Sequence, residues 1–224
     1  RAHYPITFHG VGLSLGSLDP INLEYIKKLK LLIKRFNPSL VSDHLCWSSY
    51  DGTHGNDLFP MPYSKEALDH IVSRILQVQD MLGQRIMIEN VSSYVTYQSD
   101  EMTEWGFLSE VVKKADCDLL CDVNNIYVSA KNHQFDPLDY IQALPYERIK
   151  EIHLAGYQDE GTHLLDTHGA EVHPPVWSLY RQTIELMGPK ATLIEWDNNI
   201  PNFNVLHQEA KKAGSILEHH YAAA

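Results

Sequence analysis

The chain has 224 residues, 44% of them hydrophobic, and a formal net charge of -11 at pH 7, which suits one large domain with a substantial core. The acidic balance disfavours a nucleic-acid-binding groove, which needs clustered Lys and Arg, and no apolar run reaches the roughly 20 residues of a membrane span. We therefore expect neither a nucleic acid nor a membrane as partner. Three cysteines without CxxC spacing argue against a disulfide framework and fit a cytoplasmic protein.

Short apolar runs rich in β-branched residues alternate with longer segments of helical periodicity. The apolar runs predict strands at 6–14, 40–47, 85–90, 119–125, 149–156 and 192–199. The periodic segments predict helices at 20–36, 64–82, 103–115, 136–143, 174–187 and 203–218. This alternation indicates parallel βαβ units, in an open doubly wound sheet or in part of a (β/α)8 barrel. No linker interrupts it, so a single domain over 1–224 is expected.

Every predicted strand ends in a side chain that can bind a metal or transfer a proton. These side chains are His9, Asp43, His44, Glu89, Asn90, Asp122, Asn124, Asn125, His153, Glu195 and Asp197. In barrels the carboxyl ends of all strands open on one face, where active sites are built. One such residue is usually a helix cap, but neighbouring buried carboxylates need a counter-charge that a metal can supply. Histidine and carboxylate donors without thiolate suit Fe, Mn or Zn.

The stretch EIHLAGYQDEGTHLLDTHGAEVHPPVW (151–177) adds two candidates to this group. His153 ends a predicted strand, and the following loop returns through Asp166 and His168. Because an i, i+2 spacing in extended chain places both side chains on one side, we predict Asp166 and His168 as ligands. His163 and His173 are interpreted as surface loop residues.

Seven motifs of the chain together resemble one known family. They are FHGVGLSLGS, LVSDHLCWSS, IMIENVSSY, CDVNNIYVSAKNHQFDP, EIHLAGY, DTHGAEVHPPVWSLY and LIEWDNNIP. In this order they resemble the multinuclear non-haem iron-dependent oxidative enzymes, the family of the methanobactin-biosynthesis B-type subunit. The resemblance implies an α/β fold, a TIM-type barrel similar to xylose isomerases. It also implies two or three iron ions, O2 as co-substrate, and oxidative modification of cysteine in a ribosomally made precursor peptide, with a separate partner protein that recognises the peptide leader.

The resemblance further implies roles for individual residues. By motif position the metal ligands are His9, His44, Glu89, Asp122, His153, Asp166, His168 and Glu195. Among these we predict Glu89, Asp122 and His153 as catalytic, with Glu89 bridging two irons. The residues expected to hydrogen-bond to the ligands are Asp43, Asn90, Asn124, Asn125 and Asp197. Asn125 falls where some peptide-modifying relatives carry a further His.

The family has about two βα units before the motif ITFHG, so only about six of eight are expected here. Because open parallel edges are usually avoided, we expect a longer native protein or edges covered by another chain.

Two other functions remain open at this point. One is a divalent-metal (Zn or Mn) sugar isomerase or hydrolase of the xylose-isomerase or endonuclease-like barrel type, in which the metal acts without redox change. The acidic net charge counts against the endonuclease, and the lack of a lysine at any predicted strand end counts against many sugar isomerases. The other is a non-enzymatic metal-binding protein. Oxygen consumption with a thiol peptide would separate the iron enzyme from both.

Overall fold

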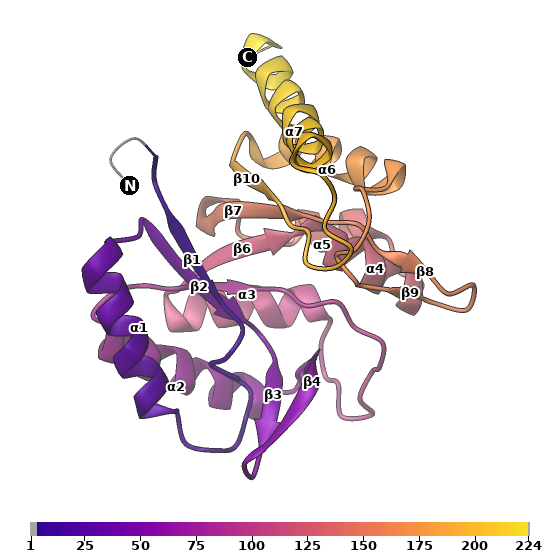
Figure 1. The fold of residues 1–224 in the computed structure, drawn as a ribbon. Coiled ribbons are helices and arrows are strands. Elements are labelled where there is room, and N and C mark those ends of the chain that lie inside the picture. The colour runs from indigo at the N-terminus through magenta and orange to yellow at the C-terminus, as the bar shows by residue number, and fades with distance from the viewer. Residues whose placement is uncertain (1–3, 224) are drawn as a thin grey trace. The chain divides into compact units, whose positions relative to one another are not determined.

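A computed structural model describes residues 4–223, which form two compact units (Figure 1). The first unit contains the residues up to Val91 together with Val95–Leu120, and the second contains Ser92–Tyr94 and the residues from Cys121 onward. The predicted domain range 1–224 therefore includes residues 1–3 and 224, which lie outside the described part. Within that part, no helix is long and apolar enough to cross a membrane.

The first unit is built on a parallel sheet. Its strands lie in the order β1 (Thr7–Gly10), β2 (Leu40–His44), β5 (Met87–Glu89) and β6 (Asp118–Asp122), although the last two residues of β6 belong to the second unit. The register places His9 opposite Ser42 and His44 opposite Glu89. Strand pairing thus brings His44 directly beside Glu89, whereas His9 pairs two residues before His44.

Three helices of the first unit begin where a side chain caps the first turn. They are α1 (Leu23–Phe36), α2 (Lys65–Leu82) and α3 (Glu104–Ala115). The capping oxygens of Asn22, Ser64 and Thr103 each accept a hydrogen bond from a backbone N–H three residues on, which satisfies a donor that the helix leaves open. The predicted start of α1 at Pro20 was three residues early, because Asn22 is the residue that supplies the cap.

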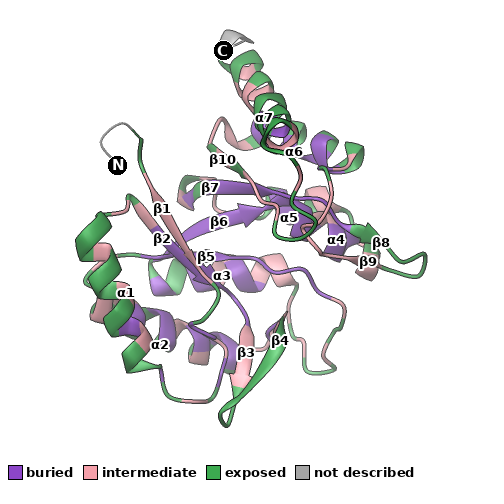
Figure 2. Ribbon diagram, in the orientation of Figure 1, coloured by how far each residue is buried: buried purple, intermediate pink, exposed green. Residues whose placement is uncertain are grey.

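An antiparallel hairpin, which the sequence analysis did not predict, follows β2. It joins β3 (Trp47–Tyr50) to β4 (Thr53–Phe59) through Asp51 and Gly52, both with positive φ. An Asp-Gly pair with two positive φ angles is the turn that best matches the twist of two antiparallel strands. The hairpin lies mostly on the surface, as the exposed colour of β4 in Figure 2 shows.

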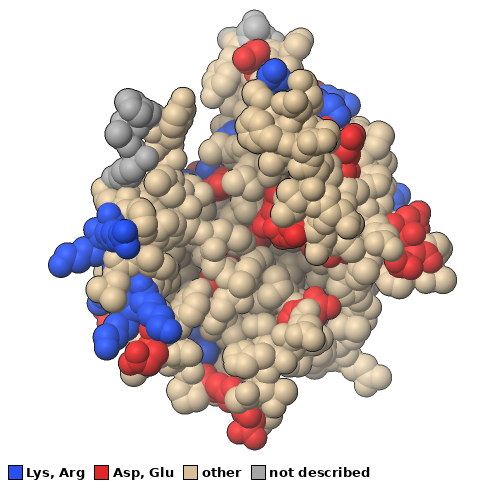
Figure 3. Space-filling view, viewed as in Figure 1, with Lys and Arg blue, Asp and Glu red and all other residues tan. Residues whose placement is uncertain are grey.

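The core and the charged surface of the first unit are clearly separated. The side chains of β5 are buried, as are Ile71, Ile75 and Val78 on the inner face of α2. Lys and Arg side chains instead gather over α1 in Figure 3, where the helix sequence LEYIKKLKLLIKRF carries them. The basic charge therefore lies on an outer helix and not at the strand ends.

The second unit contains the parallel pair β7 (Ile149–Leu154) and β10 (Ala191–Ile194), with His153 opposite Leu193. A small antiparallel pair, β8 (Gln158–Asp159) with β9 (Leu164–Leu165), lies in the loop after β7. The helical elements are α4 (Val123–His133), α5 (Pro137–Gln142), η1 (Tyr146–Arg148), α6 (Pro174–Met187) and α7 (Phe203–Ala223). As predicted, prolines stand in the first turns of α5 and α6.

Helix α4 corrects the prediction of a strand over 119–125. The strand ends at Asp122, whose side chain accepts a hydrogen bond of 2.7 Å from the Asn125 backbone N–H and so caps α4. Asn124 and Asn125 consequently lie in the first helical turn and not at a strand end. The capping bond at Asp122 starts the helix within a run whose composition also suits a strand.

Candidate metal centre

Two histidines and a glutamate of the first unit form a compact donor group. One carboxylate oxygen of Glu89, Oε2, lies 2.9 Å from His9 Nε2 and 2.9 Å from His44 Nε2. The two imidazole rings are 4.5 Å apart, and the three potential ligand atoms lie within 4.8 Å of one another. Since the residues come from β1, β2 and β5, the strand register described above positions all three.

The other nitrogen of each ring is fixed by the surrounding backbone and by Ser42. His44 Nδ1 lies 3.1 Å from the Gly10 carbonyl oxygen, which can only accept, so Nδ1 carries the hydrogen. Ser42 Oγ donates to the Phe8 carbonyl and lies 2.7 Å from His9 Nδ1, from which it therefore accepts. Both rings thus turn Nε2 toward Glu89. Metal-binding histidines are typically oriented by such a hydrogen bond from the opposite ring nitrogen.

Burial and neighbouring charges shift the pKa values of His44 and Asp43. Burial lowers the pKa of His44, but the hydrogen bond and charge of Glu89 overcome this, so the pKa is raised overall. Without a metal, a proton then lies between the His44 imidazole and the Glu89 carboxylate. A bound cation would replace that proton and use the same two side chains as ligands. Burial also raises the pKa of Asp43, opposed by the charge of His44 and by backbone hydrogen bonds.

The carboxylate of Asp43 holds the backbone around the ligands. Its oxygens accept hydrogen bonds from the backbone N–H groups of Leu13, at 3.2 Å, and His44, at 2.9 Å. Asn90, which directly follows Glu89, is buried. Both residues therefore lie beside the donor group.

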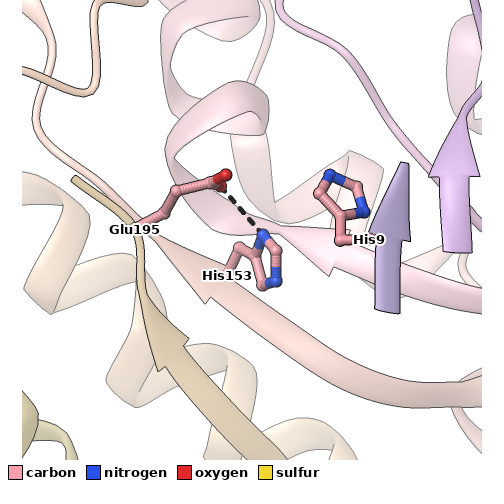
Figure 4. A group of neighbouring side chains, drawn as sticks. All are labelled: His9, His153 and Glu195. Atoms are coloured by element: carbon pink, nitrogen blue, oxygen red, sulfur yellow. Dashed lines mark hydrogen bonds and ion pairs between the residues drawn. The ribbon is translucent and has the colours of Figure 1, made fainter. Parts of the chain in front are cut away.

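The second unit holds a larger donor group around Glu195. Glu195 Oε2 lies 2.9 Å from His153 Nδ1, the contact drawn as a dashed line in Figure 4, and 3.5 Å from His168 Nδ1. His168 also contacts Asp166 Oδ1 through Nε2 at 2.8 Å and Asp197 Oδ2 through Nδ1 at 3.3 Å. Potential ligand atoms of Asp122, His153 and Glu195 lie within 4.8 Å of one another. Glu195 is thus common to two sets of donors.

Side chains from two loops and α4 hold Asp166 in place. Asn124 Nδ2 donates to Asp166 Oδ1 at 2.8 Å, and Ser92 Oγ donates to Asp166 Oδ2 at 3.2 Å. The backbone N–H of Asp166 donates to Tyr94 Oη at 3.0 Å. Asn124 therefore contacts a predicted ligand although it lies on a helix and not at a strand end.

His168 adopts an unusual backbone conformation. Its φ is 45°, in the left-handed region that non-glycine residues rarely occupy. The prediction of an extended Asp166–His168 segment is therefore wrong, although the two side chains do meet. The His168 carbonyl accepts hydrogen bonds from the backbone N–H groups of Asp197, at 2.8 Å, and Asn198, at 3.2 Å, and these bonds stabilise the conformation. Strained backbone of this kind often occurs at functional sites.

Charge balance in the second unit favours a bound cation. Five carboxylates lie in or beside the group with only two imidazoles: Asp122, Glu151, Asp166, Glu195 and Asp197. Burial lowers the pKa of His168, but hydrogen bonds to Asp166 and Asp197 and the charges of Asp166 and Asp122 raise it overall to about 12. The group therefore retains a proton in the absence of metal. Imidazole and carboxylate donors without thiolate fit a divalent Fe, Mn or Zn ion.

Among the described residues, several that lie beside the donor groups were not predicted from the sequence. Glu151 is buried, with Oε1 3.8 Å from His153 Nε2, and its i, i+2 spacing to His153 on β7 could have revealed it. Ser42, Ser92 and Tyr94 carried no distinguishing pattern, because single hydroxyl groups are common at strand ends and in loops. Asp197, expected to hydrogen-bond to ligands, lies 3.3 Å from His168 Nδ1, and its carboxylate is also at ligand distance from His168 and Glu195.

Comparison with known proteins identifies the family of the chain. The model of the RiPP precursor modification enzymes MbnB/TglH/ChrH matches residues 1–218. The chain belongs to this family. It is 54% identical over 220 residues to a UPF0276 protein of Acaryochloris marina, covering 98% of this chain and 80% of that protein. It is 51% identical over 216 residues to a UPF0276 protein of Anaeromyxobacter, covering 96% and 76%.

Solved structures confirm the predicted fold. The chain is similar to a xylose isomerase domain containing protein from Salmonella typhimurium, with a TM-score of 0.58 and 11% identity over 95% of this chain and 75% of that one. It is also similar to an L-ribulose 3-epimerase, with a TM-score of 0.60 and 11% identity over 98% and 77%. The fold is therefore α/β and of the xylose-isomerase-like TIM-barrel type. At this identity the likeness shows the fold alone, and the RiPP modification family supplies the functional context.

Proposed function

We propose that the protein is an iron- and oxygen-dependent oxidoreductase that modifies cysteine in a ribosomally made precursor peptide. The observation that carries the proposal is the family match over residues 1–218 together with the imidazole and carboxylate donors in both units. Family membership indicates an enzyme acting on RiPP precursors. The donors are compatible with this activity, since imidazole and carboxylate ligands also hold the iron of non-haem oxygenases.

Each unit has its own set of proposed metal ligands. In the first unit, His9, His44 and Glu89 would hold iron, with Ser42, Gly10 and the Asp43 carboxylate fixing their orientation. In the second unit the ligands would be Asp122, His153, Asp166, His168 and Glu195. Asp197 becomes a further candidate, although its side chain is 61% exposed.

The protein side chains orient the reactants and manage protons around the bound metal. Bound iron would supply O2 activation and would acidify a coordinated cysteine thiol. Glu89 Oε2 lies 2.9 Å from Nε2 of both His9 and His44, and the two rings present these Nε2 atoms to a cation. The proton shared by His168 and Asp166 must leave Nε2 before that nitrogen can bind metal. Metal loading should therefore release protons.

The first test is the metal content of protein purified without oxygen, measured by elemental analysis and Mössbauer spectroscopy. Two or three irons per chain are expected in the wild type, with fewer in Glu89→Ala and in His153→Ala. Glu110, whose side chain is 45% exposed, and the exposed His163 give the matched controls Glu110→Ala and His163→Ala, which should retain full iron content. One zinc or manganese per chain, or iron unaffected by Glu89→Ala and His153→Ala, would exclude this assignment.

The second test is catalytic. The iron-loaded protein, its partner protein and a cysteine-containing precursor peptide should consume O2 and change the mass of the peptide. A Cys→Ser peptide is the control and should stay unmodified. Anaerobic conversion of a sugar without O2 uptake would instead indicate the isomerase alternative.

A further inference from the structure

A cavity of about 610 Å³ lies in the first unit, separate from the metal ligands. This volume is typical of a site that binds a small molecule or a few side chains. Its walls come from the segments that follow β1, β2 and β5, including Gly16, Trp47 and Tyr97. These are the three strands that carry His9, His44 and Glu89. In barrels of this type, such loops form the substrate site.

Hydrogen bonds hold the cavity walls to one another and to the ligand strands. The Gly16 N–H donates to the Cys46 carbonyl at 2.8 Å, and the Leu45 N–H donates to the Glu89 carbonyl at 2.9 Å. Tyr97, which lines the cavity, donates a hydrogen bond from Oη to the Pro60 carbonyl at 3.0 Å. The cavity is therefore preformed, which lowers the entropic cost of binding.

The inner surface of the cavity is apolar. Trp47, Met61 and Ala67 line it, and Met61 is only 4% exposed. Leu18 and Tyr50 also line it, yet they are 74% and 57% exposed. Large apolar side chains exposed around a concave surface are typical of a binding site. A bulky apolar group inserted here would be buried favourably.

The carboxylates that line the cavity give it a negative charge. Glu66 and Glu101 contribute carboxylates, and no Lys or Arg is among the lining residues. His70 Nε2 donates to the Ser17 carbonyl at 3.0 Å, so in the neutral ring Nδ1 remains an acceptor. This arrangement favours a ligand that brings hydrogen-bond donors and positive charge, as Lys or Arg does.

We propose that this cavity binds a bulky apolar residue of the peptide substrate, flanked by basic residues that pair with Glu66 and Glu101. The inference rests on the proposed action on a peptide and adds the sequence class that the first unit selects. The apolar residue enters between Trp47 and Met61, and the basic groups lie at the carboxylates. Because the loops continue from the ligand strands, binding here would place a nearby cysteine by the donor group.

Blocked tripeptides test this proposal without knowledge of the natural substrate. Lys-Phe-Lys, Lys-Ala-Lys and Glu-Phe-Glu would be titrated into the full chain by calorimetry, with the indole resonance of Trp47 followed by NMR. We expect Lys-Phe-Lys to bind at least about tenfold more tightly than either other peptide, because only it supplies both apolar area and positive charge. Equal binding of the three peptides, or an unaffected Trp47 signal, would overturn the proposal.

Two sets of variants test the location. Ser99→Trp fills the cavity from an exposed loop position and should weaken Lys-Phe-Lys binding about tenfold or more. Gln98→Trp, at the exposed neighbour that does not line the cavity, should leave it unchanged. The double variant Glu66→Gln, Glu101→Gln should remove the preference over Glu-Phe-Glu while retaining that over Lys-Ala-Lys. Wild-type affinity in Ser99→Trp would refute this location.

The titrations would be run on metal-free and on zinc-loaded protein, because the cavity contains none of the proposed ligands. Selective binding without any iron-dependent oxidation would support the cavity and refute the proposed function. Iron-dependent oxidation of a peptide without selective tripeptide binding would support the proposed function and refute the proposed role of the cavity.

Discussion

Gly156 fixes the distance between β7 and the loop that carries Asp166 and His168. It lies two residues beyond Leu154, the last residue of β7. A methyl group at this position would lie 2.3 Å from the Ala170 carbonyl oxygen and 2.6 Å from that of Glu171. Both are backbone atoms, so no side-chain rotation can relieve the contact. The loop would have to move by about 1 Å to restore ordinary van der Waals separation.

We therefore expect Gly156→Ala to lower the free energy of unfolding by about 1–3 kcal/mol, the usual cost of overpacking a buried site. The same shift would disturb His168, whose contacts of 2.8 Å to Asp166 and 3.3 Å to Asp197 depend on the loop position. Zinc affinity of the second unit should fall about tenfold or more, since displaced supporting contacts have effects of this size.

Urea unfolding and zinc titration against a competing chelator measure the two effects. Gly214→Ala is the matched control, because a methyl group there meets nothing within 4 Å and the residue lies within α7. That variant should be stabilised by up to about 1 kcal/mol through helix propensity, with unchanged zinc affinity. Wild-type stability and zinc affinity in Gly156→Ala would refute the idea that this contact positions the loop.

The remaining predictions concern the surroundings of the ligands. Ser42→Ala should weaken metal binding about 10–100-fold by releasing His9 Nδ1, whereas Ser39→Ala, at an exposed position before β2, should not; equal chelator competition in both would contradict the role of Ser42. Because the pKa of His168 is raised from 6.5 to about 12, zinc loading at pH 7.5 should release about one proton from this ring, against about a tenth of a proton for an ordinary histidine. Calorimetry in two buffers measures it, and equal release from His168→Gln would contradict it. Burial is the main cause that raises the pKa of the Cys46 thiol, and the negative charges of Asp43 and Glu89 raise it further. Cys46 should therefore resist iodoacetamide at pH 8 until the protein is unfolded. Mass spectrometry of the labelled peptide measures this.

The six predicted strands and six predicted helices all occur, because each carried a periodic apolar pattern and most helices a clear cap or proline. The elements that were not predicted are those that depend on a local cap or turn. Helix α4 begins within a strand-like composition because Asp122 caps it, and the hairpin β3–β4 depends on the left-handed pair Asp51 and Gly52. The spacing of apolar residues along the sequence reveals neither the helix cap at Asp122 nor the turn at Asp51 and Gly52.

The donor groups were predictable at strand ends, since parallel strands align their carboxyl termini. His44 and Glu89 lie opposite each other for this reason. The tautomers of His9 and His44 could not be predicted, because they depend on Ser42 and on the Gly10 carbonyl across the sheet. The left-handed conformation of His168 likewise arises from backbone bonds to Asp197 and Asn198, 29 and 30 positions later.

Protons in each unit take the place that a cation would take. In the first unit Glu89 raises the pKa of His44 against the effect of burial, and in the second Asp166 and Asp197 do the same for His168. Buried carboxylates are costly without such compensation, so the protonated imidazoles allow each group to form before metal arrives. Metal binding is then an exchange of ion for proton, and its affinity should rise with pH. The stability that protonated His168 gives the metal-free protein is complete below pH 6.5 and declines toward pH 12. Metal-dependent stabilisation should therefore increase over the same interval.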